Sequence, residues 1–463
     1  MLNIRRIHLL LAAGALAAGF RLVYVLWVSP YFAYYGLTYE DISFERQLLV
    51  WVLSIAPALW LPVRLTRPTE AIYLVLYATV YVPSIFIALQ GGQVAPPDDI
   101  LLALALFLGV AVTGASYCFR VPRIVGANLP LPLLNAAIIT LAVAGNAWII
   151  ATCYSIMRIP DLKEIYELRF ANSDLVQNSL VRYALMIMPG AVDPLLIAFG
   201  LARRSWIWLL SGIAGYVVVF MATGLKGDVL FPLMAIGLWP LMRRRDRLPQ
   251  RLILGTGALL GVFALLEWAI GIDQPESSLF ALASILATRG FSIHGLLMSR
   301  YFIYFSSHPL THFTHVNVIA RIAGIPVTQL VNVEIGTEFW GSPDLSANAG
   351  FWAEDGLASL GLPGILVASA LVAALFWLMD AICVRHDLRV CTIALLFQAL
   401  NLANLSLFTS ILSGGLGLSL LLLWAMPPHQ ALQSVQANIP VSVRRRKYLA
   451  RGEPPQLMPA RPG

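Results

Sequence analysis

Charge is what this sequence has least of. Only 12% of its 463 residues are Asp, Glu, Lys or Arg, whereas 59% are hydrophobic and the mean hydropathy is +0.77. A soluble domain carries about 25% charged residues, so a soluble protein of this composition would have too little polar surface to face water. We therefore predict a membrane protein built from helices that each span the bilayer with about 20 apolar residues.

Cysteine is also scarce. The four cysteines lie in or beside apolar segments, and no CxxC pair or His-Cys spacing points to a bound metal. We interpret them as free hydrophobic side chains within the bilayer. The sequence also lacks a glycine-rich nucleotide fingerprint and an internal repeat, which counts against a nucleotide-sugar site and against many secondary transporters.

The apolar runs predict an all-α, polytopic fold with about 12 transmembrane helices. They cover residues 7–28, 47–63, 70–90, 99–119, 133–157, 181–201, 206–223, 228–242, 252–271, 356–379, 388–409 and 411–426. The first run follows Arg5 and Arg6 but is longer than the core of a signal peptide and lacks a clear cleavage site. We expect it to be retained as an anchor.

Basic and acidic loops alternate along the chain. Acidic residues lie in the loops around residues 40–45 and 98–99, whereas arginines occupy every second loop: Arg5/Arg6, Arg64/Arg67, Arg120/Arg123, Arg203/Arg204, Arg243–Arg247, Arg385/Arg389 and Arg444–Arg446. This pattern predicts that both termini are cytoplasmic. It explains the net charge of +7 without a nucleic-acid partner.

The chain then divides into four parts. Residues 1–271 contain the first nine predicted helices, and residues 272–349 form one large external loop with short helices. Residues 350–426 contain the last three helices. Residues 427–463 form a basic tail that we expect to be disordered and held near anionic membrane lipids.

The external loop collects most of the residues that could carry chemistry. Arg289 and Arg300 are eleven residues apart, close to three helical turns, so on one helix they would share a face. Two guanidinium groups suit a diphosphate because each offers a planar fork of donors. Interfacial arginines that touch lipid headgroups are the alternative interpretation.

Three histidines follow in the same loop, His308, His312 and His315. Their spacing would suit zinc on a helix, but Pro309 indicates a turn and no Glu directly follows His308. We expect no metal. One of these histidines is a candidate general base, since its ordinary pKa lies near neutrality; solvated loop histidines are the alternative.

Two further candidates lie at predicted membrane boundaries. Lys226 sits between glycines in Thr223-Gly-Leu-Lys-Gly-Asp and would bind a phosphate, or alternatively pair with Asp228 as a snorkelling lysine. Glu354 begins a late span, where an ionisable group is a functional candidate. Its alternative role is to complement the dipole at a helix N-terminus.

Three segments together resemble the bacterial O-antigen polymerases and, more distantly, the O-antigen ligases. They are the Thr223–Asp228 turn, Arg300 with its aromatic run up to Ser307-His-Pro-Leu, and the segment from Asn348 to Gly364. Their order, their common external placement and the large late loop match that family over roughly the second half of the chain. The resemblance implies a GT-C-like fold in the bacterial inner membrane, with the loop in the periplasm.

The resemblance also implies an activity. A metal-independent, inverting polymerase would transfer a glycan from undecaprenyl diphosphate to a sugar hydroxyl of a lipid-linked repeat unit, for O-antigen, capsule or exopolysaccharide. It would need no cofactor, and a chain-length regulator would be a further partner. The implied diphosphate-binding residues are Lys226, Arg289 and Arg300, the candidate bases are His308, His312, His315 and Glu354, and the glycan-binding residues are Trp340, Trp352 and Asn348.

Two departures and two alternatives accompany this resemblance. The chain has Lys226 where the family has arginine, and Ala347 where ligases have a histidine, which favours a polymerase over a ligase. A different lipid-dependent glycosyltransferase would use Glu40-Asp41. A polysaccharide transporter or flippase would carry charges in the middle of its spans. The predicted spans are nearly uncharged there apart from Glu267, which lies toward the outer end of its span, and this counts against transport.

Overall fold

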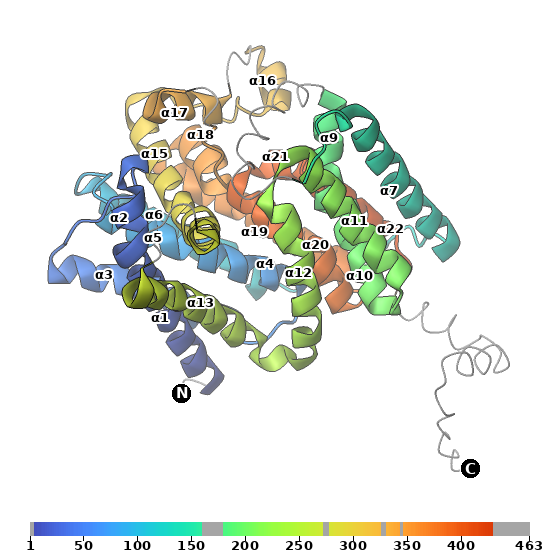
Figure 1. Cartoon of the computed structure of the whole chain (residues 1–463), viewed down its shortest axis with the longest axis horizontal. Coiled ribbons are helices and arrows are strands. Elements are labelled where there is room, and N and C mark those ends of the chain that lie inside the picture. The colour runs from blue at the N-terminus through green and yellow to red at the C-terminus, as the bar shows by residue number, and fades with distance from the viewer. Residues whose placement is uncertain (1–3, 160–178, 272–276, 326–329, 343–345, 429–463) are drawn as a thin grey trace.

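The computed structural model describes residues 4–159, 179–271, 277–325, 330–342 and 346–428. Within these ranges every regular element is a helix (Figure 1). The α-helices are α1 (Ile4–Val23), α2 (Ser29–Phe32), α3 (Phe44–Ile55), α4 (Pro68–Leu76), α5 (Val82–Gln90), α6 (Asp98–Ala115), α7 (Leu131–Cys153), α9 (Ser179–Ile187), α10 (Asp193–Arg203), α11 (Trp206–Thr223), α12 (Lys226–Leu241), α13 (Leu248–Ile270), α14 (Ser278–Ala283), α15 (Ile293–Ser307), α16 (Asn317–Ala323), α17 (Val331–Trp340), α18 (Ala358–Leu360), α19 (Leu362–Cys383), α20 (Leu388–Asn404), α21 (Leu407–Leu412) and α22 (Leu416–Ala425).

Wider π turns and tighter 3-10 turns join several of these helices. The π turns are η1 (Tyr24–Val28), η4 (Tyr77–Tyr81), η7 (Met188–Val192), η9 (Ser284–Ser292) and η10 (Trp352–Leu357). The 3-10 turns are η2 (Ala33–Tyr35), η3 (Ala56–Leu59), η5 (Ser116–Cys118) and η8 (Met242–Arg247). The predicted basic tail lies almost entirely outside the described residues.

Nine helical stretches of the described chain are long and apolar enough to cross a membrane. They are Ile4–Tyr35, Pro68–Gln90, Asp98–Cys118, Leu131–Cys153, Leu180–Arg203, Trp206–Thr223, Gly227–Ile270, Ser278–Ser307 and Leu362–Cys383. The apolar helices Leu388–Asn404 and Leu416–Ala425 are shorter. A helical, multi-pass membrane protein is therefore confirmed, while the count of about 12 spans and the GT-C-like arrangement stay predictions.

Two of these stretches differ from the predicted boundaries. Residues 278–307, which we assigned to the external loop, form a helix of 30 residues whose most apolar 18-residue segment has a mean hydropathy of 1.4, the lowest such value of the nine. Polar residues such as Arg289 interrupt the apolar run, so a search for uncharged runs does not detect this helix. The 44-residue stretch Gly227–Ile270 is bent at Arg244, whose backbone is non-helical, at the boundary predicted between two spans.

Burial separates central from peripheral helices. In the stretch Pro68–Gln90, 89% of the most apolar window is buried inside the protein, whereas in α7 the share is 17%. The exposed side of α7 carries large apolar residues such as Leu133, Val143 and Trp148. Such a surface suits lipid rather than water, because soluble monomers rarely expose large contiguous apolar patches.

Close helix contacts rely on small residues. Helices α1 and α13 pack against each other along their length, and a Cβ added at Gly19 would collide with the carbonyl of Gly257. Small residues that let two backbones approach are typical of helix pairs in membranes. A larger residue at either glycine would force these helices apart.

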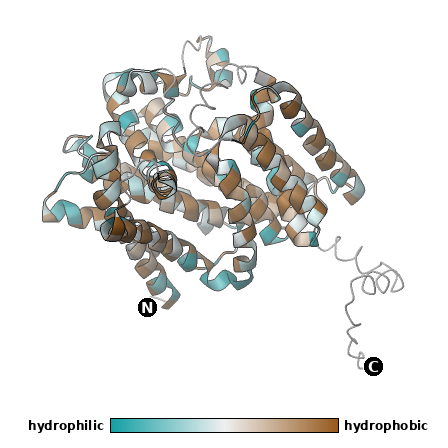
Figure 2. Cartoon of the chain, in the orientation of Figure 1, coloured by the Kyte–Doolittle hydropathy of each residue, from teal (hydrophilic) through white to brown (hydrophobic). Residues whose placement is uncertain are grey.

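Three of the segments predicted on the cytoplasmic side meet at one end of the structure, which we call the basic end (residues 5–6, 64–67 and 242–247). Arg5 forms an ion pair with Asp246 at 3.1 Å, and the amide of Leu65 donates to the carbonyl of Arg245. The N-terminus and the bend between α12 and α13 lie at the bottom of Figure 1, opposite α16 and α17. Figure 2 shows this bend as a hydrophilic patch below apolar helices. The grouping of these loops is thus seen, and their cytoplasmic placement stays a prediction.

Candidate functional site

A π turn places two acidic residues at the end of the structure opposite the basic end. Turn η10 contains Glu354 and Asp355 and leads through α18 into α19. A π turn widens a helix by one residue and often occurs at functional sites. Gly350, just before it, packs so closely on the end of α20 that a Cβ would collide with the carbonyl of Leu402. The two acids are therefore held against the segment that follows α20.

Asp355 is fully buried and accepts three hydrogen bonds. Its Oδ1 accepts from the hydroxyl of Ser406 at 2.6 Å and lies 3.2 Å from Nε2 of His315, and its Oδ2 accepts from the amide of Leu407. A carboxylate oxygen can only accept a hydrogen bond. Because it accepts, the Nε2 atom of His315 carries the ring hydrogen.

The other ring nitrogen of His315 is therefore the one with the lone pair. Nδ1 lies 3.1 Å from the hydroxyl oxygen of Thr311. The loop that carries both residues is fixed to the helical body, since the amides of Thr311 and His312 donate to the carbonyls of Ala358 and Ser359 at 2.8 and 3.1 Å. This pair of His315 and Asp355 joins residues that are 40 positions apart in the sequence.

Glu354 lies beside this pair. Its Oε2 accepts from the amide of Ser406 at 3.0 Å, and its Oε1 accepts from the amide of Ala349 at 3.3 Å and from the hydroxyl of Tyr301 at 3.5 Å. Burial, and next the charge of Asp355, raise the pKa of Glu354 to about 8. A carboxyl group with such a pKa exchanges protons near neutral pH.

Two arginines approach the turn at Tyr35 and Gly36. The guanidinium of Arg289 lies 5.5 Å from the centre of the Tyr35 ring. A Cβ added at Gly36 would collide with the guanidinium of Arg300, and the φ of Gly36 is 104°. Both arginines therefore approach the same turn, although they do not lie on one regular helix: Arg289 is in the π turn η9 and Arg300 is in α15. Their predicted role in binding a diphosphate stays a prediction.

Aromatic rings from α17 complete this group of side chains, which we call the arginine cluster (Tyr35, Arg289, Arg300, Phe339 and Trp340). The guanidinium of Arg300 lies 4.3 Å from the ring centre of Phe339, and the ring of Trp340 stacks on Tyr35 at 4.9 Å. Nε1 of Trp340 also donates to the carbonyl of Tyr35 at 3.3 Å. Nε of Arg300 is buried and has no hydrogen-bond partner within the described part of the chain, so the guanidinium keeps donor capacity for a ligand.

Helix α15 links the arginine cluster to the acids. Arg300 approaches Gly36, while the next residue, Tyr301, is fully buried and donates to the carbonyl of Ala347 at 3.0 Å. The same hydroxyl contacts Glu354. Consecutive residues on a helix point in directions about 100° apart. Arg300 therefore faces the turn at Gly36, while Tyr301 faces Glu354. We call this whole arrangement the loop-end site (Tyr35, Arg289, Arg300, His315, Glu354 and Asp355).

The other predicted bases lie outside the loop-end site. His308 is exposed, and its ring stacks on Tyr304 at 3.9 Å while its Nδ1 lies 2.9 Å from the carbonyl of that residue. His312 is exposed and has a left-handed φ of 48°. The three histidines thus do not converge. Among the described residues there is no group of three or more His, Cys, Asp or Glu that would hold a metal ion.

The predicted glycan-binding residues separate as well. Trp340 belongs to the arginine cluster. Trp352 is only 2% exposed and donates from Nε1 to the hydroxyl of Ser369 at 2.8 Å, so its ring faces the protein interior. Asn348 accepts from the hydroxyl of Ser346 at 2.8 Å and from the side-chain amide of Asn332.

Lys226 is the first residue of α12, two positions after the left-handed Gly224 that ends α11. Its side chain lies outside the described part of the structure. The predicted role of Lys226 therefore stays a prediction.

Sequence reasoning missed several residues that the structure brings together. Nothing in the sequence near Tyr35 indicated contact with residues that lie more than 250 positions later. Ser406 carried no signal beyond its place after an apolar run. Asp193, in contrast, could have been found, because it lies within the predicted span 181–201 and an ionisable residue there is by itself a functional candidate. The statement that Glu267 is the exception among nearly uncharged spans was therefore wrong.

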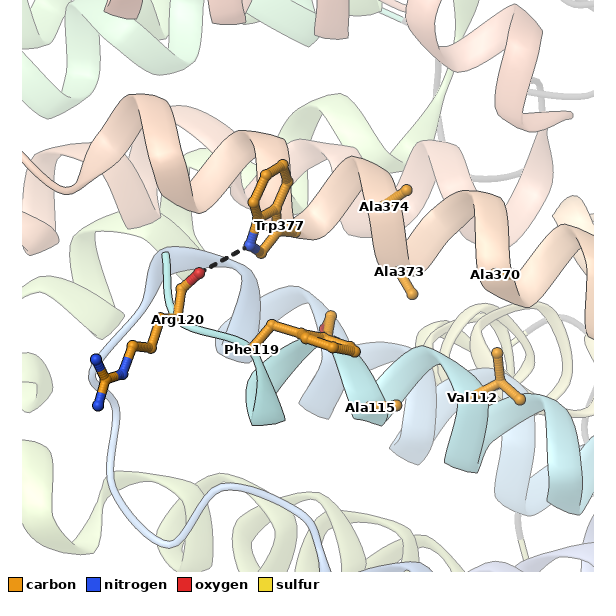
Figure 3. A pocket seen from close by; sticks show the side chains of 9 residues that line it. Val112, Ala115, Phe119, Arg120, Ala370, Ala373, Ala374 and Trp377 are labelled. Carbon is orange, nitrogen blue, oxygen red and sulfur yellow. Dashed lines mark hydrogen bonds between the residues drawn. The ribbon is translucent and has the colours of Figure 1, made fainter. Parts of the chain in front are cut away.

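An apolar groove of about 510 Å³ lies away from the loop-end site, between α6 and α19 (Figure 3). Nε1 of Trp377 donates to the carbonyl of Arg120 at 3.0 Å and closes one end of it. The lining contains no acidic residue or histidine; it consists of Val112, Ala115, Ser116, Phe119, Arg120, Ala370, Ala373, Ala374 and Trp377.

Comparison of the chain with protein-family models, with curated proteins and with solved structures found no match. Any function assigned to the chain consequently depends on the geometry of its sites and on the resemblance of its motifs.

Proposed function

We propose that this protein is a polymerase that transfers a glycan from a lipid-linked diphosphate to a sugar hydroxyl, as its resemblance to the O-antigen polymerases implies. The reaction would take place at the outer face of the bacterial inner membrane, with undecaprenyl diphosphate as the leaving group. One observation carries the proposal: Arg300 and Tyr301 are neighbours on α15. The guanidinium of Arg300 lies against the ring of Phe339, and the hydroxyl of Tyr301 contacts Glu354 of the acidic pair.

The arginine cluster supplies what a diphosphate leaving group needs. Negative charge grows on the bridging oxygen as the glycosidic bond breaks, and fixed cations near that position lower the barrier. Arg289 and Arg300 offer two guanidinium groups around one turn. The aromatic rings of Tyr35, Phe339 and Trp340 hold these side chains in place through cation–π contacts and stacking.

The pair of His315 and Asp355 supplies what an attacking hydroxyl needs. Inversion by one displacement requires a base that takes the hydroxyl proton as the new bond forms. Asp355 orients the ring of His315 and stabilises the imidazolium that results, so Nδ1 is the proton acceptor. The Thr311 hydroxyl at 3.1 Å from Nδ1 indicates that a hydroxyl group fits at this nitrogen. Of the four candidate general bases, we therefore choose His315, with Glu354 as the next choice.

The test is deletion of the gene in its native host, followed by a gel of the surface polysaccharide. A polymerase deletion leaves a single repeat unit on its acceptor and removes the ladder of longer chains. Plasmids carrying the wild type or His308→Gln should restore the ladder, whereas His315→Gln should not. An unchanged ladder after deletion, or the loss of even the single unit, would contradict the proposal.

A further inference from the structure

The groove between α6 and α19 (Figure 3) begins where these two helices stop touching closely. Just before it they are in tight contact, since a Cβ added at Gly109 would collide with the side chains of Ile365 and Ser369. Beyond this contact the small side chains of Ala115 and Ala373 leave a space of about 510 Å³. This volume lies within the range of about 300 to 1,000 Å³ that is typical of small-molecule sites.

The surface around the groove suits an apolar chain. Leu108 of α6 and Leu371 of α19 are 50% and 39% exposed. They lie four and three residues from Val112 and Ala374 of the lining, so they share its face. Both helices belong to stretches that are apolar enough to cross a membrane. In a bilayer the groove therefore opens toward lipid tails.

Among the described residues that line the groove, only Arg120 is charged, and it lies at one end (Figure 3). It follows the apolar stretch that ends at Cys118 by two residues, which places it at a membrane boundary. Nε1 of Trp377 donates to its carbonyl, while its guanidinium extends away from the alanines of the lining. Arg120 is exposed, and within the described part of the chain its guanidinium forms no hydrogen bond or ion pair.

The C-terminal end of α6 does not need Arg120 as a counter-charge. Arg67 donates to the carbonyls of Tyr117 and Phe119 at 3.4 and 3.0 Å. These bonds satisfy carbonyls at the end of the helix, where the negative end of its dipole lies. Arg67 itself lies 4.0 Å from Asp380, which compensates its charge. The charge of Arg120 is left for a ligand.

We propose that the groove binds one phospholipid with a net negative headgroup. An acyl chain lies between α6 and α19, and the phosphate accepts hydrogen bonds from Arg120, whose planar fork of donors matches two phosphate oxygens. A zwitterionic headgroup fits less well, because the described lining has no acidic residue to pair with its amine. Basic sites between membrane helices are known to bind anionic lipid headgroups.

This phospholipid is distinct from the lipid-linked substrate proposed above. Helix α19 begins directly after η10 and α18, which carry the acids of the loop-end site, and the groove lies farther along it. Arg67 belongs to the basic end and contacts the carbonyl of Phe119, the residue before Arg120. The cation of the groove thus lies at the basic end, whereas a substrate diphosphate is needed at the opposite end. The site does not depend on the proposed glycosyl transfer.

Photo-crosslinking tests the proposal on the purified full-length protein in liposomes. The probes are phosphatidylglycerol and phosphatidylethanolamine with the same diazirine in one acyl chain; light releases N₂, and the remaining carbene inserts into a nearby C–H bond. Peptide mass spectrometry measures the adduct on residues 370–377 for equal amounts of each probe. We expect about fivefold more adduct from phosphatidylglycerol, the effect of one arginine on an anionic headgroup at a membrane surface.

Two pairs of variants separate the headgroup from the acyl chain. Arg120→Gln should abolish the preference for phosphatidylglycerol, whereas Arg204→Gln, at the end of α10, should keep it. Ala115→Leu fills the groove and should lower the adduct from both probes, whereas Ala137→Leu on α7 should not. All four residues are exposed, so the substitutions should leave the fold intact.

Three results would overturn the proposal. They are equal labelling by both probes in the wild type, a preference for phosphatidylglycerol that survives Arg120→Gln, and an adduct that Ala115→Leu leaves unchanged. Competition with unlabelled lipids tests the choice of occupant. If a polyprenyl phosphate suppresses the adduct at a lower concentration than phosphatidylglycerol does, the groove holds a carrier lipid and the assignment to a phospholipid is wrong.

Discussion

Replacing Asp355 by Asn should abolish transfer while leaving the protein folded. The amide of Leu407 needs an oxygen at the position of Oδ2, so the new NH₂ group would take the position of Oδ1 and face His315. Nε2 would then have to accept a hydrogen bond, and the ring hydrogen would move to Nδ1, where it would point at Thr311. A histidine in this tautomer cannot take a proton through Nδ1.

The expected size of the effect follows from these contacts. Loss of a positioned general base lowers the rate by about 10²- to 10⁴-fold. The cost in stability is smaller: the new NH₂ group cannot accept from Ser406 or His315, so both of them must accept from it instead, at about 1 kcal/mol each, while the bond from Leu407 remains. The variant should therefore purify as a folded protein with a modestly lower unfolding temperature.

The assay measures chain elongation in proteoliposomes that contain the purified protein and a lipid-linked repeat unit, with products separated on a gel. Asp98→Asn is the matched control, since Asp98 is exposed in the first turn of α6. His315→Gln should match Asp355→Asn. A folded Asp355→Asn protein that elongates chains at the wild-type rate would refute the assignment of His315 as the base.

Three further variants probe other parts of the structure. Arg300→Ala should slow elongation by about 10²- to 10³-fold because a fixed cation is lost, and Arg300→Lys should recover only part of the rate; full activity in both would exclude this residue from the diphosphate site. For Glu354, the raised native pKa of about 8 means that the folded protein retains a proton which the unfolded chain releases near pH 4.3. The stability that this proton provides is present at pH 4 and lost as the pH rises through 8, so the unfolding temperature of the wild type should fall more steeply over that range than that of Glu354→Gln, and parallel curves would contradict the assignment. Thr69→Val should destabilise the protein by about 1 to 3 kcal/mol, because Asp380 loses the buried hydroxyl donor; an unchanged unfolding temperature would show that this bond is not formed.

Much of the fold follows from local composition. The apolar runs placed most of the membrane helices, and the alternation of arginine-rich loops anticipated the contacts of Arg5 with the 242–247 bend. The search failed for residues 278–307 because Arg289, His294 and Arg300 interrupt the apolar run. These polar residues do not prevent a helix when neighbouring elements bury them or provide aromatic partners.

The candidate site was predictable only in its parts. Arg289, Arg300, Glu354 and three histidines could be named from residue type and position. Which of these candidates lie together in one site could not be predicted, because that depends on which side chains meet in the folded protein. Asp355 had no distinction from Glu354 in the sequence, yet it is the residue that contacts His315.

The sequence by itself determined that this protein is helical and that it belongs in a membrane, and it placed most of the candidate site residues late in the chain. Hydropathy and helix formation depend on neighbours within a few turns, so a linear pattern contains that information. Only the tertiary structure decided that Tyr35 joins the two arginines, that His315 rather than His308 meets an acid, and that Gly215 lies against the carboxyl group of Asp193. Those pairings are set by how helices pack across large separations in sequence, where no local pattern constrains them.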